Sequence, residues 1–320
     1  MKRTMLYLSV IVFTLCLCGC ENIIVLFTHK KEIVKKQTPL QQKANAYFWK
    51  HFSGGNYDSM PQILSKLTAA YLENPNEVVT TSHLAWTHIW AISESSKMKV
   101  KDARVTDHMI LAKKYFSEAY ELNPNDGRIL GFLAATAMSE GSIDKDDRKS
   151  VHGYFILKEA IDKYPLFNLF TGGYIMSRLP KDHDGFKEGL GYQWDILDEC
   201  MCEKVDRENF DVRKYLHLAT TKGDKRVCWN TPMVPHGEEA FFLNLGDMLV
   251  KNGEVEKGIK IYNNAKLTKG YDTWKFKDIL DDRIKDAVEN QKNFNQENLK
   301  DDRKVMMINS SFSCMGCHLN

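Results

Sequence analysis

Apolar residues recur at helical spacing along nearly the whole chain from about Thr38 onward. Few stretches alternate between apolar and polar residues as half-buried strands do, and the 320 residues include only eight prolines. The pattern therefore predicts an all-α protein. It also predicts one irregular region, because residues 166–235 contain several glycines and a turn-rich stretch, which indicate short helices with long connections.

A set of small and large residues returns at fixed offsets within these expected helices. A small or aliphatic residue, a large apolar residue, a small residue and a proline follow one another at intervals of four, three and five residues. Small residues let two antiparallel helices approach closely, and large residues fill the gap between neighbouring pairs. The sets are Ala112, Phe116, Ala119 and Pro124; Ile63, Leu67, Ala70 and Pro75; and Gly153, Leu157, Ala160 and Pro165, while one further stretch carries both helices of a pair, with Phe242, Leu245, Gly246 and Leu249 followed by Gly258, Tyr262 and Ala265.

These offsets resemble the tetratricopeptide repeat, which consists of one helical hairpin. The resemblance is uneven, because successive units are separated by 49 and 41 residues, beyond the roughly 34 of the standard repeat. Loops rich in Lys, Asp and Ser at 93–106 and 141–150 look like insertions between paired helices. We therefore expect residues 41–290 to form an irregular tetratricopeptide-like solenoid of helical hairpins with long loops. A globular helical bundle whose helix pairs mimic the repeat is the alternative.

The first residues of the chain carry an export signal. Lys2 and Arg3 precede an apolar stretch, residues 5–17, that is too short for an ordinary membrane span. The sequence L-C-G-C at residues 17–20 resembles the lipobox of bacterial lipoproteins. The resemblance implies removal of residues 1–19 as a signal peptide and lipidation of Cys20, with palmitate among the acyl chains. More than one acyl chain suffices for stable anchoring.

A lipidated Cys20 implies a protein held at the periplasmic face of a membrane. Glu21 stands after the cysteine where aspartate would favour the inner membrane, so the outer membrane is expected. The alternative is an uncleaved anchor that continues to Phe27, which would place Glu21 and Asn22 in the membrane at high cost. Residues 20–40 then form a basic tether, whose lysines are either solvated or in contact with anionic headgroups.

The end of the chain contains C-x-x-C-H, formed by Cys314, Cys317 and His318. This is the attachment signature of c-type haem, because two intervening residues place both sulfurs on one edge of the porphyrin and the histidine where it binds the iron. We expect one covalent haem c, with Cys314 and Cys317 as thioether sites and His318 as axial ligand. Haem attachment occurs outside the cytoplasmic membrane in bacteria, which agrees with the export signal. The alternatives are a plain disulfide beside an incidental histidine and half of a metal site.

Residues 291–320 form a polar C-terminal segment that leads into this motif. Its apolar run, residues 305–308, is expected to dock on the helical body and carry the haem into place. On the opposite face of the iron, His236 or Met233 from a proline-rich loop is the candidate distal ligand. A five-coordinate or water-bound iron is the alternative.

Three of the eight cysteines have no role in export, lipidation or haem attachment: Cys200, Cys202 and Cys228. In an oxidising compartment one pair and one free thiol are expected. A bridge between Cys200 and Cys202 would be strained, so Cys228 is expected to pair with one of them. A C-x-C copper or zinc site with a nearby histidine is the alternative.

Most histidines have an ordinary structural interpretation. His83 shares a helix face with Trp86 or Trp90 at helical spacing, which predicts an aromatic core stripe. Others, such as His108 and His183, are expected to be surface or capping groups.

The charge balance and the motifs limit the class of function. Lys and Arg number 44 against 42 Asp and Glu, so no strong overall charge indicates a nucleic-acid partner. Lipobox, repeat-like body and terminal motif together resemble exported bacterial proteins that carry one C-terminal c-type haem on a helical repeat body. The resemblance implies electron transfer or a redox scaffold with envelope protein partners, rather than an enzyme. A non-haem adaptor lipoprotein is the alternative; a redox enzyme is less supported, since no distal acid–base pair can be identified.

Overall fold

The computed structural model describes residues 32–95, 104–229, 237–296, 299, 301 and 303–310. The chain divides into two compact units, Met1–Ile33 and Val34–Asn320, and nearly all described residues belong to the second. The described residues form α-helices and short 3-10 turns without any strand, which confirms the all-α prediction. None of the described helices is both long and apolar enough to cross a membrane.

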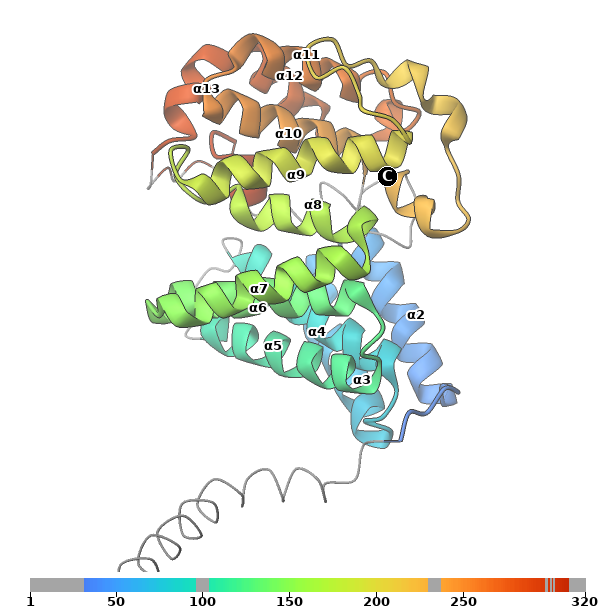
Figure 1. Ribbon diagram of the computed structural model, residues 1–320. Helices are drawn as coiled ribbons and strands as arrows, with labels where there is room; N and C mark the ends of the chain where they lie inside the picture. Colours follow the sequence, from blue (N-terminus) through green and yellow to red (C-terminus); the bar gives the residue numbers. More distant parts are fainter. Residues whose placement is uncertain are drawn as a thin grey trace, which may run out of the picture. The chain divides into compact units, whose positions relative to one another are not determined.

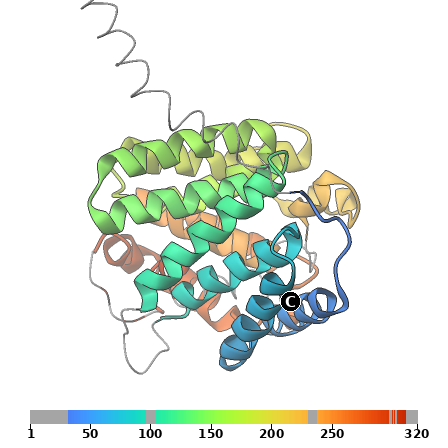
Figure 2. The ribbon, with the colours of Figure 1, turned by 90° about the horizontal axis from the view of Figure 1, so that it is seen from below.

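Consecutive helices pack against each other as hairpins, which confirms the predicted helical-hairpin fold (Figure 1). Figure 2 shows the same succession of helices from below. The pairs are α2 (Pro39–Ser53) with α3 (Met60–Glu73), α4 (Val78–Ser93) with α5 (Arg104–Leu122), α6 (Gly127–Asp144) with α7 (Asp147–Lys163), α8 (Pro165–Met176) with α9 (Asp184–Met201), and α10 (Glu238–Asn252) with α11 (Val255–Ala265), after which α12 (Lys277–Lys285) and α13 (Ala287–Asn293) pack on the last pair.

The residues of the recurring pattern lie between the helices of these hairpins. Ala112, Phe116 and Ala119 of α5 are fully buried. Gly153 of α7 lies against α6, because a Cβ atom added to it would be 2.6 Å from Cγ of Met138. The small residues therefore set the distance between paired helices, as the sequence pattern indicated.

Replacing Gly246 of α10 by alanine is expected to lower the free energy of unfolding by about 1–3 kcal/mol. A Cβ atom there would lie 2.3 Å from the ring of Tyr262, which is fully buried and donates a hydrogen bond to Asp247. Urea denaturation measures the change. The matched control is Gly191→Ala in α9, where a Cβ atom meets nothing within 4 Å. That variant should gain about 0.5–1 kcal/mol from helix propensity; equal gains in both variants would contradict the close approach at Gly246.

The predicted insertion at residues 141–150 is wrong. Helix α6 continues to Asp144 and α7 begins at Asp147, so the connection is a tight turn with Lys145 in the left-handed conformation. The polar residues of this stretch lie on the solvent-facing sides of two helix ends and do not form a loop. The other predicted insertion, residues 93–106, is described only at its ends, since residues 96–103 lie outside the described part.

The predicted irregular region is narrower than residues 166–235. Helices α8 and α9 form a regular hairpin up to Met201, and only the following stretch is built of short 3-10 turns: η3 (Val212–Lys214), η4 (Leu216–Leu218) and η5 (Asp224–Cys228). The glycines were misleading because they lie inside helices. A Cβ atom on Gly173 would be 1.9 Å from Nε2 of Gln193, so glycine is needed there for close helix packing.

Two large apolar clusters form most of the core of the described residues, beside a small third one of Phe167 and Val227. One joins α2 to α5 with the start of α6, and the other joins α6 to α13. His83 and Trp90 are buried in the first cluster, which confirms the predicted aromatic core stripe. The His83 ring stacks on Phe48 and its Nδ1 is 2.7 Å from Oδ1 of Asn45, while burial lowers the pKa of His83 to about 3.

His183 and His108 were both predicted to be surface or capping groups, and the structure agrees for the first and differs for the second. His183 accepts a hydrogen bond from the backbone N–H of Gly185 and caps α9, as predicted. His108 is instead paired with buried His88, and their Nδ1 atoms are 2.8 Å apart. Burial, aided by the charge of His108, lowers the pKa of His88 to about 4.

Candidate functional site

The residues predicted to carry the chemistry lie outside the described part of the chain. These are Cys20, the distal-ligand candidates Met233 and His236, and the motif residues Cys314, Cys317 and His318. The last described residue is Ser310, four positions before Cys314. What the structure describes near this site is the segment that leads into the motif, residues 303–310, and the part of the helical body on which it packs.

The segment before the motif is packed into the helical body. Met306, Met307 and Ile308 are 1%, 0% and 5% exposed and belong to the apolar cluster that contains α10 and α11. Two of them belong to the 3-10 turn η7 (Met307–Asn309), and buried Ser310 after it donates a hydrogen bond from its hydroxyl to the Met307 carbonyl. These contacts confirm the prediction that the apolar run 305–308 docks on the body.

A buried ion pair holds this segment in place. Asp247 of α10 and Arg283 of α12 are 0% and 1% exposed, and Nε of Arg283 lies 3.0 Å from Oδ1 of Asp247. Asp247 also accepts hydrogen bonds from the Tyr262 hydroxyl at 2.7 Å and from the Met307 backbone N–H at 2.8 Å. The guanidinium of Arg283 donates its remaining bonds to the backbone carbonyls of Arg303 and Val305. One pair of side chains thus fixes the backbone from residue 303 to residue 307. We refer to Asp247, Arg283 and Tyr262 as the anchor cluster.

The electrostatics of the anchor cluster follow from its complete burial. Burial raises the pKa of the Asp247 carboxyl, and the guanidinium of Arg283 opposes that rise. Burial also raises the pKa of the Tyr262 hydroxyl well above its usual value. Tyr262 is therefore a neutral donor at physiological pH, and each member of the cluster depends on the others to satisfy its buried polar atoms.

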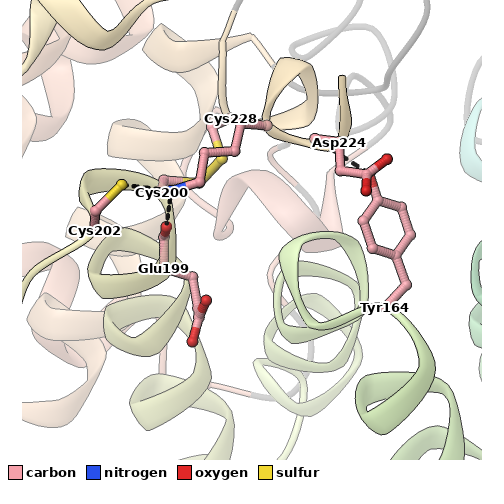
Figure 3. Close-up of a disulfide and its surroundings, with 7 residues drawn as sticks. Tyr164, Glu199, Cys200, Cys202, Asp224 and Cys228 are labelled. Carbon is pink, nitrogen blue, oxygen red and sulfur yellow. Dashed lines mark hydrogen bonds between the residues drawn. A yellow bond between two sulfur atoms is a disulfide. The ribbon is translucent and has the colours of Figure 1, made fainter. Parts of the chain in front are cut away.

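A disulfide joins the irregular stretch to α9. Cys200 near the end of α9 and Cys228 of η5 are bonded, with Cα atoms 5.6 Å apart (Figure 3). The structure thus has one of the two pairings that the sequence left open, and Cys202 is an exposed free thiol. Nζ of Lys225 lies 2.5 Å from the sulfur of Cys202 and 3.2 Å from the Glu199 carbonyl. Because Cys200 is bonded to Cys228, it does not provide a thiolate for a C-x-C copper or zinc site.

A small apolar cavity of about 40 Å³ lies beside this disulfide and is called here the disulfide cavity. Its wall comes from α8, α9, the irregular stretch and the first turns of α10. The indole Nε1 of Trp229 is buried and has no hydrogen-bond partner among the described residues. Besides Cys200 and Cys228, the lining includes Phe170, Met201, Trp229, Phe241 and Phe242.

No family model, curated protein or solved structure matches the chain. Its function therefore has to be inferred from its own residues and their arrangement.

Sequence reasoning missed the anchor cluster and the disulfide cavity. A usable signal exists for Asp247, an acidic residue inside the apolar run A-F-F-L-N-L-G-D-M-L-V of α10, since a buried acid needs a partner. Nothing in the sequence indicates that this partner is Arg283, because the two are 36 positions apart. The cavity likewise depends on segments that only the fold brings together.

Proposed function

We propose that this chain is an exported, lipid-anchored protein that carries one c-type haem on Cys314 and Cys317 and serves in electron transfer or as a redox scaffold. The observation that carries the proposal is the anchored segment before the motif. Its backbone is bound by buried Asp247 and Arg283 up to Met307, three residues before the described chain ends. A pair of cysteines that holds no cofactor does not require the segment before it to be anchored in this way.

The anchored segment restricts where the haem is carried. Cys314 lies four positions after Ser310, and an extended chain of that length spans at most about 14 Å. The thioether sites are thereby kept close to the helical body, as an electron carrier that exchanges with a partner at a defined surface requires. When bound, the haem would supply one-electron chemistry at its iron, and His318 would hold that iron.

The disulfide supports the exported location. Cys200 and Cys228 are at a normal bridging distance, with Cα atoms 5.6 Å apart. Structural disulfides persist in the periplasm and on cell surfaces and are rare in the cytosol. Together with the lipobox at Cys20, the pair favours the compartment in which c-type haem is attached.

A denaturing gel stained for haem peroxidase activity tests the proposal on protein made in a host competent for cytochrome c maturation. Wild type should give a stained band at the mature mass, and Cys317→Ala should abolish covalent retention. His318→Ala should keep some covalent haem but change its absorption spectrum, because the iron loses its proximal ligand. An unstained wild-type band with a disulfide or thiols at Cys314 and Cys317 would contradict the proposal and favour the non-haem adaptor.

A further inference from the structure

We propose that one end of the helical body rests on the anionic phospholipid surface in which Cys20 is anchored; this inference rests on the lipid anchor of the function proposed above. The contact surface is called here the tether end. It holds the body with one face toward the membrane, which a lipid anchor alone does not do. The tether end consists of the exposed apolar residues Val34, Leu40, Leu72 and Val79 together with Lys35 and Lys36.

Three helix ends meet at this surface. Leu40 lies in the first turn of α2, Leu72 in the last turn of α3 and Val79 in the first turn of α4. The side-chain amide of Gln41 in α2 donates a hydrogen bond to the Asn74 carbonyl at 3.0 Å, so the start of α2 lies beside the end of α3. A short connection of four residues joins α3 to α4, so the start of α4 lies there too.

The apolar side chains of the tether end are left uncovered by the rest of the described chain. Leu72 is 71% exposed, Val79 is 42% exposed and Leu40 is 40% exposed. Nine large apolar residues of the described second unit are exposed, and four of them lie at this one end. Exposed apolar side chains that gather in this way, with polar residues around them, are typical of a surface that contacts a membrane or another protein.

The charges of the tether end favour a membrane as the occupant. Lys35 and Lys36 are exposed beside the apolar side chains, and apolar area combined with lysine is what binds a protein surface to anionic headgroups. Two acidic side chains of the body also lie at this end. Glu77 is buried as the N-cap of α4, and exposed Glu73 accepts a hydrogen bond from the Thr38 hydroxyl at 2.5 Å.

The tether joins the body at this same surface. The backbone N–H of Val34 donates a hydrogen bond to the Asn76 carbonyl, between α3 and α4, at 3.0 Å. Val34 lies fourteen positions after Cys20, so an extended chain between them spans at most about 50 Å. A tether this short makes even a weak surface contact intramolecular, at roughly millimolar effective concentration. The bilayer is therefore the partner that this surface meets most often.

Photocrosslinking of the acylated, full-length mature protein in vesicles of phosphatidylethanolamine and phosphatidylglycerol tests the inference. A p-benzoylphenylalanine in place of Leu72 should give lipid adducts at least about fivefold more often than the same group in place of Val288. Val288 on α13 is the matched control, because it is an aliphatic residue with 76% exposure away from the tether end. Adducts of Leu72-substituted protein with a second copy or another protein, in place of lipid, would overturn the inference.

The outcome for the inference can be separated from the outcome for the proposed function. Equal lipid adducts at positions 72 and 288, in protein whose mass includes the acyl chains on Cys20, would contradict the inference and leave the proposed function standing. Protein without those acyl chains would contradict the lipid anchor of the proposed function, and this inference with it.

Charge reversal adds a second readout. Lys35→Glu combined with Lys36→Glu should reduce the lipid adducts at position 72 by at least about threefold, because anionic headgroups then repel the surface. Lys269→Glu combined with Lys275→Glu is the matched control, since both lysines are exposed and the net charge changes equally. Equal adduct yields from the two double variants would overturn the proposed contact with an anionic lipid surface.

Discussion

Replacing Arg283 by methionine is expected to lower the free energy of unfolding by about 3–5 kcal/mol, since it leaves the Asp247 carboxylate buried without its cation. Both side chains are almost completely shielded from solvent, at 1% and 0% exposure. The Arg303 and Val305 carbonyls also lose their donor, so the segment before the haem motif should detach first. Urea denaturation measures the loss of stability, and limited proteolysis after Lys304 measures the detachment.

Arg303 provides the matched control for Arg283. It pairs with Asp278 and Asp282 on the surface and its side chain is 50% exposed. Surface ion pairs contribute roughly 0–1 kcal/mol, so Arg303→Met should change stability little. A loss for Arg283→Met no larger than that for Arg303→Met would show that the buried pair does not anchor the segment.

Removing the disulfide with Cys200→Ala and Cys228→Ala is expected to lower the free energy of unfolding by about 3–4 kcal/mol. The bond closes a loop with a sequence separation of 28 residues, and the chain-entropy relation assigns a loop of that size about this much. The irregular stretch 202–229 has only short 3-10 turns of its own, and the bond joins its far end to α9 in addition to the hydrogen bonds of Val205 and Arg207 with Asp198. Thermal or urea unfolding without reductant measures the loss.

Cys202→Ala is the control for the disulfide variant, because it removes a cysteine side chain without removing the Cys200–Cys228 bond. Cys202 is exposed and free, so its replacement should leave stability within about 0.5 kcal/mol of wild type. Equal destabilisation by both sets of substitutions would contradict the Cys200–Cys228 pairing and point to exchange among the three cysteines.

The sequence predicts the hairpins because their determinants are local. Leu67 and Phe116 recur at fixed offsets, and both are fully buried between paired helices. The apolar run 305–308 could also be identified as a docking segment, because an apolar run within a polar segment needs a partner surface. These features follow from periodicity and hydrophobic burial alone.

The predictions that failed, stayed open or were not made required knowledge of tertiary contacts. Gly173 looks like a turn signal in sequence, whereas its lack of a side chain serves the contact with Gln193. The choice between Cys200 and Cys202 as the partner of Cys228 depends on how α9 ends, which spacing does not define. Asp247 and Arg283 meet because two helices distant in sequence pack together. Such pairings are set by the fold and cannot be read from local patterns.

The most direct test of the central claim is mass spectrometry of the C-terminal peptide from mature protein purified out of the membranes of a maturation-competent host. The peptide that contains Cys314 and Cys317 should carry the mass of one haem, joined through both sulfurs. A peptide of unmodified mass, with two thiols or with a disulfide between Cys314 and Cys317, would contradict the claim that this chain is a c-type haem protein.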